Sequence, residues 1–171
     1  MPNGNRTSSS RIRNLAEVAA FTALYAVLTW VFAPISYSVF QFRVAEVLKS
    51  IVVRRRHLIA AFVVGNALSN IFSPFVGPWE LLWMPFINLV GASTAWFIGS
   101  HISGRKGMFI GGAIYAIWVA FGLGFMLSTL FNLPFALVFL YVLVPESILI
   151  IGFVPLMQIV DTRIGALLKH D

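Results

Sequence analysis

The sequence predicts an all-α protein that crosses a membrane several times. Of its 171 residues, 59% are hydrophobic and only 11% are charged. Its apolar runs approach or exceed the ~18 residues that indicate a transmembrane helix. The period-two alternation typical of a membrane β-barrel is absent from the sequence. A soluble core of this size does not need such runs, so we expect a single polytopic helical domain.

The apolar runs predict six membrane segments, separated by clusters of Pro, Gly, Ser and Asn that favour turns. The second segment spans only about 15 Å at 1.5 Å per residue, so it either extends into its flanks or stops short of a full crossing. The first run is too long for the apolar part of a signal peptide, and we expect it to be retained as a helix. In order, the segments are 15–33, 44–53, 58–72, 81–98, 108–131 and one within 135–160.

The positions of lysine and arginine predict the orientation, because cytoplasmic loops carry an excess of both. Six crossings put the tails 1–14 and 162–171 on one side of the transmembrane domain 15–161, and we expect the first tail to be disordered. Lys49 is expected to reach that side by extending along its helix, which leaves Arg43 alone on the other. We therefore place both termini in the cytoplasm, and we attribute the net charge of +6 to topology rather than to nucleic-acid binding. The other basic residues on the cytoplasmic side are Arg6, Arg11, Arg13, Arg54, Arg55, Arg56, Arg105, Lys106, Arg163 and Lys169.

Three carboxylates are predicted within the membrane. Glu46 and Glu80 open the second and fourth segments from the outside, and Glu146 lies well inside the sixth. Asn66 and Asn70 lie one turn apart on one face of the third segment. An ionisable residue inside a span costs at least ~2.5 kcal/mol and is by default a candidate functional group. We therefore expect these five side chains to meet in the outer half of the membrane.

Each of these residues also has a simpler explanation. Arg43 and Glu46, spaced i and i+3, could neutralise each other. Glu80 could be an interfacial acid favoured by the helix dipole, and the two asparagines could join packed helices. Glu146 follows Pro145 in an apolar run and has no basic partner nearby in the sequence. The remaining acids are expected at solvated cytoplasmic ends, and they are Glu17, Asp161 and Asp171.

Aromatic and small residues indicate two further surfaces. Aromatic side chains of the outer loops form either an interfacial belt or a stacking wall for a planar ligand, and they are Tyr37, Phe40, Phe42, Trp79 and Trp83. Alanines of the first segment form i, i+4 pairs that let another helix approach closely, and they are Ala16 with Ala20 and Ala19 with Ala23. The spacing fits either a partner protein or packing within the monomer. Gly107 and Gly111 on the fifth segment have the same two explanations.

No catalytic or metal-binding pattern stands out in the sequence. Segment 99–106 has glycine spacing like that of a phosphate-binding loop, but Arg105 occupies the lysine position and no Ser or Thr follows it. His57, His101 and His170 lack the spacing of metal ligands. The absence of cysteine excludes disulfides and thiolate metal sites. We therefore expect a protein that is not an enzyme and binds no cofactor or metal.

Three stretches resemble the QueT family, whose members are substrate-binding S components of energy-coupling factor (ECF) transporters assigned to queuosine precursors. They are QFRVAEVL at 41–48, GNALSNIFSP at 65–74 and PESILI at 145–150. The resemblance runs from about residue 16 to about residue 158. It implies a six-helix S-component-like bundle in the cell membrane that captures a scarce small molecule from outside. It also implies docking on a transmembrane coupling subunit driven by two cytoplasmic ATPases, which would use the ATP, with the alanines of the first segment at the contact.

The resemblance implies a 7-deazaguanine queuosine precursor as the ligand. Glu146 or Glu46 would accept the adjacent N–H donors of the base edge in a fork, and a second acid would pair with an aminomethyl cation if the ligand carries one. Asparagines would bind the ring carbonyl and nitrogen, an aromatic side chain would stack on the ring, and Arg43 would hold Glu46 in position. The predicted substrate-binding residues are Phe42, Arg43, Glu46, Asn66, Asn70, Trp79, Glu80 and Glu146.

Two alternative functions remain open at this stage. One is an S component for another vitamin or nucleobase. The other is an integral membrane enzyme or structural subunit that uses the intramembrane carboxylates for catalysis or proton transfer. The second alternative predicts that the acids are accessible from the lipid or from the cytoplasmic side.

Overall fold

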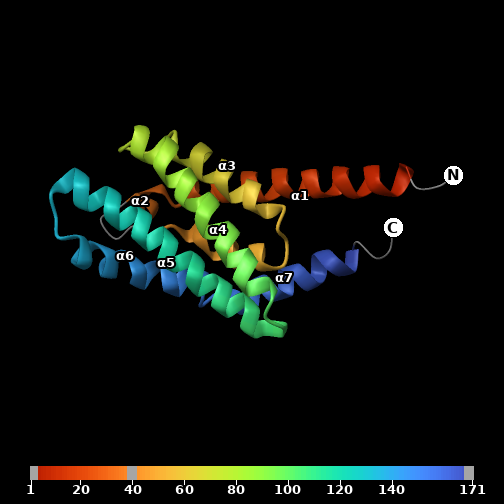
Figure 1. The fold of residues 1–171 in the computed structure, drawn as a ribbon. Coiled ribbons are helices and arrows are strands. Elements are labelled where there is room, and N and C mark those ends of the chain that lie inside the picture. The colour runs from red at the N-terminus through yellow and green to blue at the C-terminus, as the bar shows by residue number, and fades with distance from the viewer. Residues whose placement is uncertain (1–3, 38–41, 168–171) are drawn as a thin grey trace.

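The computed structural model describes residues 4–37 and 42–167, with side chains from Ser10 onward (Figure 1). Within these ranges every regular element is a helix, which confirms the all-α prediction. The elements are α1 (Gly4–Val31), α2 (Ala33–Ser36), η1 (Val44–Val53), α3 (Leu58–Asn70), η2 (Trp79–Trp83), α4 (Met84–Ser100), α5 (Gly104–Phe131), α6 (Phe135–Ile150) and α7 (Val154–Leu167). The predictions that fall outside the described residues or side chains are those for Arg6, Phe40, Lys169, His170 and Asp171.

The chain is a multi-pass membrane protein. Large apolar side chains point outward along the helices, whereas carboxylates and amides lie in the interior, the reverse of a soluble protein. Helix α3 and η1 are shorter than the other segments, with 13 and ten residues, so the predicted number of six crossings is not established by helix length. The stretches that are long and apolar enough to span a membrane are Ser10–Val31, Trp79–Ser100, Gly104–Phe131 and Phe135–Leu167.

Element η1 lies at the centre of the bundle, surrounded by the other helices, and does not face the lipid. It is a 3-10 helix, and nine of its ten residues are buried. It packs against α1, α3, α4, α5, α6 and α7. The rise of about 2.0 Å per residue in 3-10 geometry lets ten residues reach about 20 Å, further than an α-helix of that length. The short second segment is therefore accommodated by stretching and by burial.

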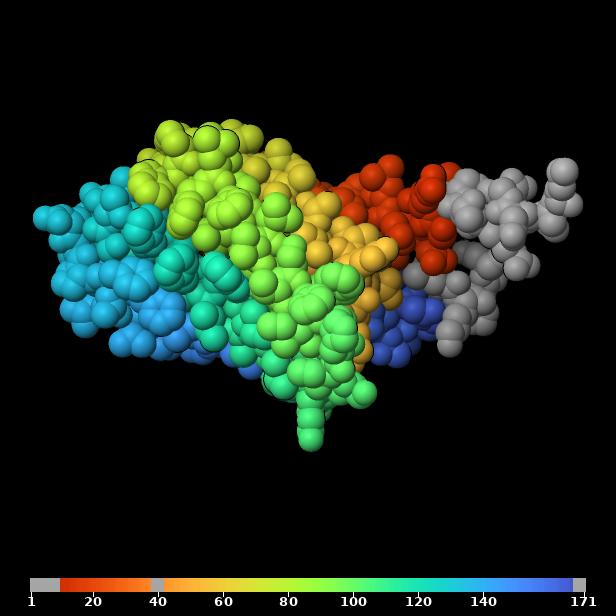
Figure 2. All heavy atoms as spheres, in the orientation of Figure 1, coloured from red at the N-terminus to blue at the C-terminus, as the bar shows by residue number. Residues whose placement is uncertain are grey.

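Small residues let α4 and α5 pack closely around η1. A Cβ atom added at Gly107 would overlap the backbone oxygens of Gly99 and Ile102, and one added at Gly111 would lie 2.8 Å from the backbone oxygen of Ala95. The glycine pair of α5 therefore serves packing within the monomer. On the face shown in Figure 2, the side chains of α4 fill the space between α3 and α5.

Both ends of the described chain lie at the same end of the bundle, and the turn between α5 and α6 lies at the opposite, distal end (Figure 1). Helix α1 begins at Gly4, so residues 4–14 are helical where we expected a disordered tail. Residues 5–31 contain neither proline nor glycine, and a helix nucleated in the membrane adds one hydrogen bond per residue as it extends. Helix α7 likewise continues to Leu167, beyond the predicted boundary at residue 161.

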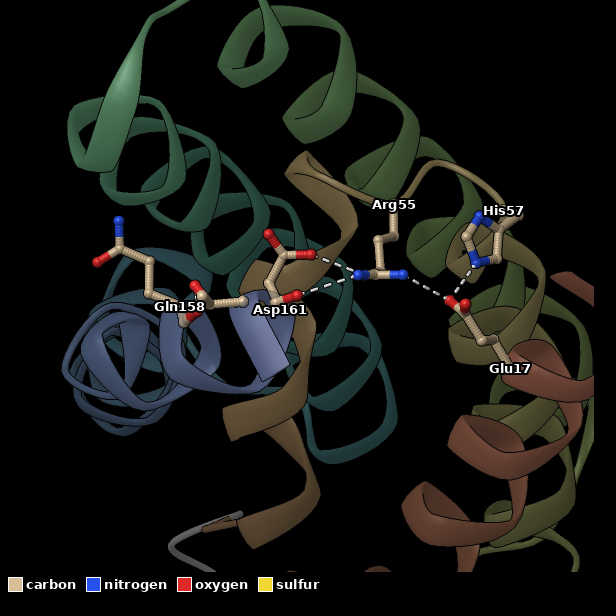
Figure 3. A network of polar contacts seen from close by, with 6 residues as sticks. Glu17, Arg55, His57, Gln158 and Asp161 are labelled. Atoms are coloured by element: carbon tan, nitrogen blue, oxygen red, sulfur yellow. Dashed lines mark hydrogen bonds and ion pairs between the residues drawn. The ribbon is translucent and has the colours of Figure 1, made fainter. Parts of the chain in front are cut away.

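Arg55, in the loop between η1 and α3, joins the first and last helices away from the distal end (Figure 3). Its Nη1 donates to Glu17 Oε2 at 2.9 Å, and its Nε donates to Asp161 Oδ1 at 2.7 Å. His57 Nε2 lies 2.8 Å from the same Glu17 oxygen. We expected Glu17 and Asp161 to be solvated surface acids. They are instead partly buried and paired, and these four residues are called the Arg55 clamp below.

Replacing Arg55 by glutamine is expected to destabilise the bundle, because Arg55→Gln leaves two half-buried carboxylates without their shared cation. Hydrogen bonds to charged groups contribute about 1.5–3 kcal/mol each, so a clear fall in the melting temperature in detergent is expected. Lys106→Gln removes the same charge from an exposed site on α5 and is the matched control. Equal melting temperatures for the two variants would contradict a stabilising role of the clamp.

A charged chamber inside the bundle

Polar residues from several helices surround one small internal chamber. Its walls come from the start and middle of η1 and from α3, η2, α4, α5 and α6. The side chains leave room for about one water molecule. The lining residues are Arg43, Glu46, Lys49, Asn66, Glu80, Met84, Val119, Leu123 and Glu146.

The 3-10 geometry of η1 explains why its charges face the same way. Residues spaced i and i+3 eclipse one another at 3.0 residues per turn. Glu46 and Lys49 have this spacing, and Arg43 precedes Glu46 by the same interval at the N-cap. All three line the chamber. An α-helix with 3.6 residues per turn would rotate successive members of this series away from one another.

Glu46 is held by partners that its sequence neighbours did not reveal. The Tyr25 hydroxyl donates to Glu46 Oε1 at 2.5 Å, and the Lys49 ammonium pairs with Oε2. We expected Lys49 to extend to the cytoplasmic side, but its side chain is 0% exposed. That expectation was wrong because the 3-10 register aims Lys49 at Glu46, one turn away, and burial of η1 closes every route to the surface.

Arg43, the expected partner of Glu46, does not form an ion pair with it. Its guanidinium lies over the Tyr37 ring, 5.6 Å from the centroid, and the side chain is largely buried. Among the described side chains, the ion pair within 4.0 Å of Glu46 is made by Lys49. The simple pairing of Arg43 with Glu46 is therefore not what the structure shows, although Arg43 stays close enough to add positive potential to the chamber.

Glu146 and Glu80 each place a carboxylate oxygen in the chamber that accepts no hydrogen bond from a described residue. Glu146 is 2% exposed and Glu80 is 5% exposed. One oxygen of each, Oε2, lacks a hydrogen-bond partner in the described part of the chain. An unsatisfied buried carboxylate oxygen is costly, so each of these two oxygens calls for an explanation, such as a functional role or a bound water or ion.

The two asparagines of α3 have different surroundings. Asn66 lines the chamber, and its role in ligand binding stays a prediction. Asn70 is not among the lining residues, because its Nδ2 donates to the backbone oxygen of Glu80 at 2.9 Å and to Asn66 Oδ1 at 3.4 Å. This amide ties the end of α3 to η2 and thereby positions Glu80.

Two tyrosines missed by the sequence analysis complete the polar interior. Tyr25 and Tyr115 are fully buried, and their rings lie 5.8 Å and 4.8 Å from Lys49 Nζ. Tyr115 donates to Asn88 Oδ1 at 3.1 Å. Neither tyrosine has a local sequence signal, because each lies in an apolar helix where a buried aromatic residue is ordinary.

A family model described as QueT transporter matches residues 15–162, which is most of the chain. This protein belongs to the QueT transporter family. The match confirms the resemblance carried by the three sequence stretches, and it assigns the chain a role in membrane transport. The comparison with curated proteins finds no match, and neither does the comparison with solved structures.

The predicted aromatic residues of this QueT protein do not line the chamber. Trp79 and Trp83 meet edge to face with centroids 6.0 Å apart, and both line an open surface groove with Phe86. Phe42 is partly buried against the hydrophobic core. The apolar walls of the chamber are instead Met84, Val119 and Leu123. Trp79 and Trp83 therefore fit an aromatic belt at the membrane interface better than a wall that stacks on a ligand.

The alanines of α1 form an exposed strip. All four predicted docking residues are exposed, and they share one face of the helix at i, i+3, i+4 and i+7. The opposite face is buried and carries Tyr25. Packing within the monomer therefore does not account for the strip, whose members are Ala16, Ala19, Ala20 and Ala23.

Removing the Tyr25 hydroxyl is expected to destabilise the QueT protein more than removing that of Tyr115. Tyr25→Phe takes a donor from the buried Glu46 carboxylate, which contributes about 1.5–3 kcal/mol, whereas Tyr115→Phe breaks a neutral bond of about 0.5–1.5 kcal/mol. Thermal unfolding of both variants in the same detergent measures the difference. A Tyr25→Phe variant as stable as wild type would show that the hydrogen bond from Tyr25 to Glu46 does not stabilise the fold.

Proposed function

We propose that this QueT protein is the substrate-capture subunit of an ATP-driven ECF transporter and that it takes up a 7-deazaguanine queuosine precursor. The observation that carries the proposal is the convergence of Glu46, Glu80, Glu146 and Asn66, from four separate elements, on one chamber. Family membership supports transport, and the chamber supplies the recognition chemistry.

The burial of the acids favours binding over the alternative of a membrane enzyme. That alternative expects carboxylates that are reached from the lipid or from the cytoplasmic side. Glu46 and Glu146 are each only 2% exposed and face an enclosed space. Among the described residues, no three or more His, Cys, Asp or Glu side chains are placed so that they could hold a metal ion together. A closed, partly apolar chamber with a few convergent polar groups is typical of small-molecule recognition.

The chamber offers a guanine-like base a complementary edge. Glu146 is the best acceptor for adjacent N–H donors, because its Oε2 is unpartnered whereas both oxygens of Glu46 are already in use. The amide of Asn66 can bind the ring carbonyl. The ring would pack on Met84, whose polarisable sulfur suits an aromatic face. The aromatic wall expected from Phe42 or Trp79 is not part of this proposal.

The topology of the proposed transporter follows from the positions of the charges and of the chain ends. We propose six crossings with the distal end facing outside, because Arg54, Arg55, Arg105 and Lys106 lie in or beside the loops away from that end. The exposed alanine strip would contact the transmembrane coupling subunit, and two cytoplasmic ATPases would drive release. Small side chains allow the close helix contact that such docking requires.

Replacing Glu146 by glutamine is expected to weaken binding of the base by more than tenfold, since a charged hydrogen bond contributes about 1.5–3 kcal/mol. Calorimetric titration of the purified protein with 7-deazaguanines measures this. Glu17→Gln is the matched control, because the same change then lies in the Arg55 clamp and outside the chamber. Unchanged affinity of Glu146→Gln would remove Glu146 from the site. If another base or vitamin raises the melting temperature of wild type in a thermal-shift panel and the 7-deazaguanines do not, that compound replaces them as the proposed ligand.

Placing a bulky residue on the alanine strip is expected to abolish uptake but leave ligand binding intact. Ala19→Trp blocks close approach of a partner helix without touching the chamber. Leu137→Trp puts the same side chain at a 66% exposed position on α6 and is expected to leave uptake unchanged. Uptake in cells and binding by the purified variants separate the two effects. Loss of binding in Ala19→Trp, or normal uptake, would contradict a docking role for the strip.

A further inference from the structure

Lys49 is a buried cation whose surroundings do not fully satisfy it. Its side chain is 0% exposed, and Glu46 is the ion-pair partner that the described residues supply. An ammonium has three donors, and the rings of Tyr115 and Tyr25 lie 4.8 Å and 5.8 Å from this one. Burying an ion is costly even after relaxation, so a buried pair of this kind is weak evidence of a purely stabilising role.

The chamber holds one more carboxylate than it holds cations. Its acids are Glu46, Glu80 and Glu146, and its bases are Arg43 and Lys49. The surplus is visible as unpartnered oxygen, because Oε2 of Glu146 and Oε2 of Glu80 find no hydrogen bond within the described residues. A further basic group in the chamber would make the acidic and basic groups equal in number and would give these oxygens a donor.

The chamber in this structure is too small for a planar base, so a wall residue has to move when a ligand enters. Glu46 is held by the Tyr25 hydroxyl at 2.5 Å, and Asn66 lies on α3 beside Asn70, its hydrogen-bond partner. Lys49 differs from both, because its ammonium sits at the end of a flexible four-carbon stem with many rotamers. A change of rotamer alone can therefore move its ammonium away from Glu46.

We propose that Lys49 is the resident occupant of a primary-ammonium site, and that its ammonium holds Glu46 until a cationic ligand group displaces it. The proposal deepens and rests on the proposed function, since it states which charge the substrate carries and which residue selects for it. On loading, the ligand ammonium binds the Glu46 side of the chamber, and Lys49 turns toward the other chamber acids, where Glu80 Oε2 has no hydrogen-bond partner among the described residues. The acids and the cations in the chamber are then equal in number, and no covalent step is involved.

Chemical rescue tests this site without any assumption about the natural ligand. Lys49→Ala removes the ammonium and its stem and leaves a space that propylammonium fits. Propylammonium chloride is expected to raise the melting temperature of Lys49→Ala in detergent well beyond its effect on wild type. Sodium chloride and 1-propanol, at matched concentration, are expected to give no such increase. Lys49→Met fills the space and is the variant that propylammonium does not rescue. Equal shifts for Lys49→Ala and wild type would overturn the proposal.

A binding experiment covers the case in which Lys49→Ala does not fold. Lys49→Met removes the competing ammonium but keeps the stem, so the ratio of affinities for 7-aminomethyl-7-deazaguanine and 7-deazaguanine is expected to rise by about tenfold. A purely structural role lowers both affinities alike, and that result would overturn the proposal. If wild type binds neither base but propylammonium rescues Lys49→Ala, the ammonium site stands and the queuosine-precursor assignment fails. If wild type binds the bases but propylammonium does not rescue Lys49→Ala and Lys49→Met does not change the affinity ratio, only the proposed role of Lys49 is overturned.

Discussion

The three-residue period of η1 is the constraint on which the interior of this protein depends. It places Glu46 and Lys49 on one line and directs both into the chamber. The Tyr25 hydroxyl then fixes Glu46 from α1, so that a charged pair is tolerated at the centre of an apolar bundle. Because η1 contacts six of the surrounding helices, a change in its position would reach most of the fold.

Helix α1 connects the chamber to the surface proposed for docking. Its buried face carries Tyr25, which reaches Glu46, and its exposed face carries the alanine strip. The Arg55 clamp joins the other end of α1 to α7 through Glu17 and Asp161. A rotation or tilt of α1 would therefore alter the chamber, the strip and the clamp together, which is the physical link that a capture subunit needs between loading and release.

Much of the chamber could be predicted from the sequence, because carboxylates and amides are rare in apolar runs and expensive to bury alone. That reasoning predicted that Glu46, Asn66, Glu80 and Glu146 lie close together, and all four line the chamber. It failed for Lys49, since helical spacing and snorkelling were applied to a segment that is a buried 3-10 helix. It also failed for Glu17 and Asp161, whose partner Arg55 is distant in sequence, and no local pattern reveals such a contact.

The most direct test of the account is native mass spectrometry of the purified protein, released from detergent with any small molecule that it carries. If the chamber is the ligand site, wild type retains a bound planar base of the 7-deazaguanine class, and the Glu146→Gln variant loses it. Retention of the same molecule by both proteins, or a wild-type protein that carries lipid alone after exposure to these bases, would contradict a ligand site in the chamber.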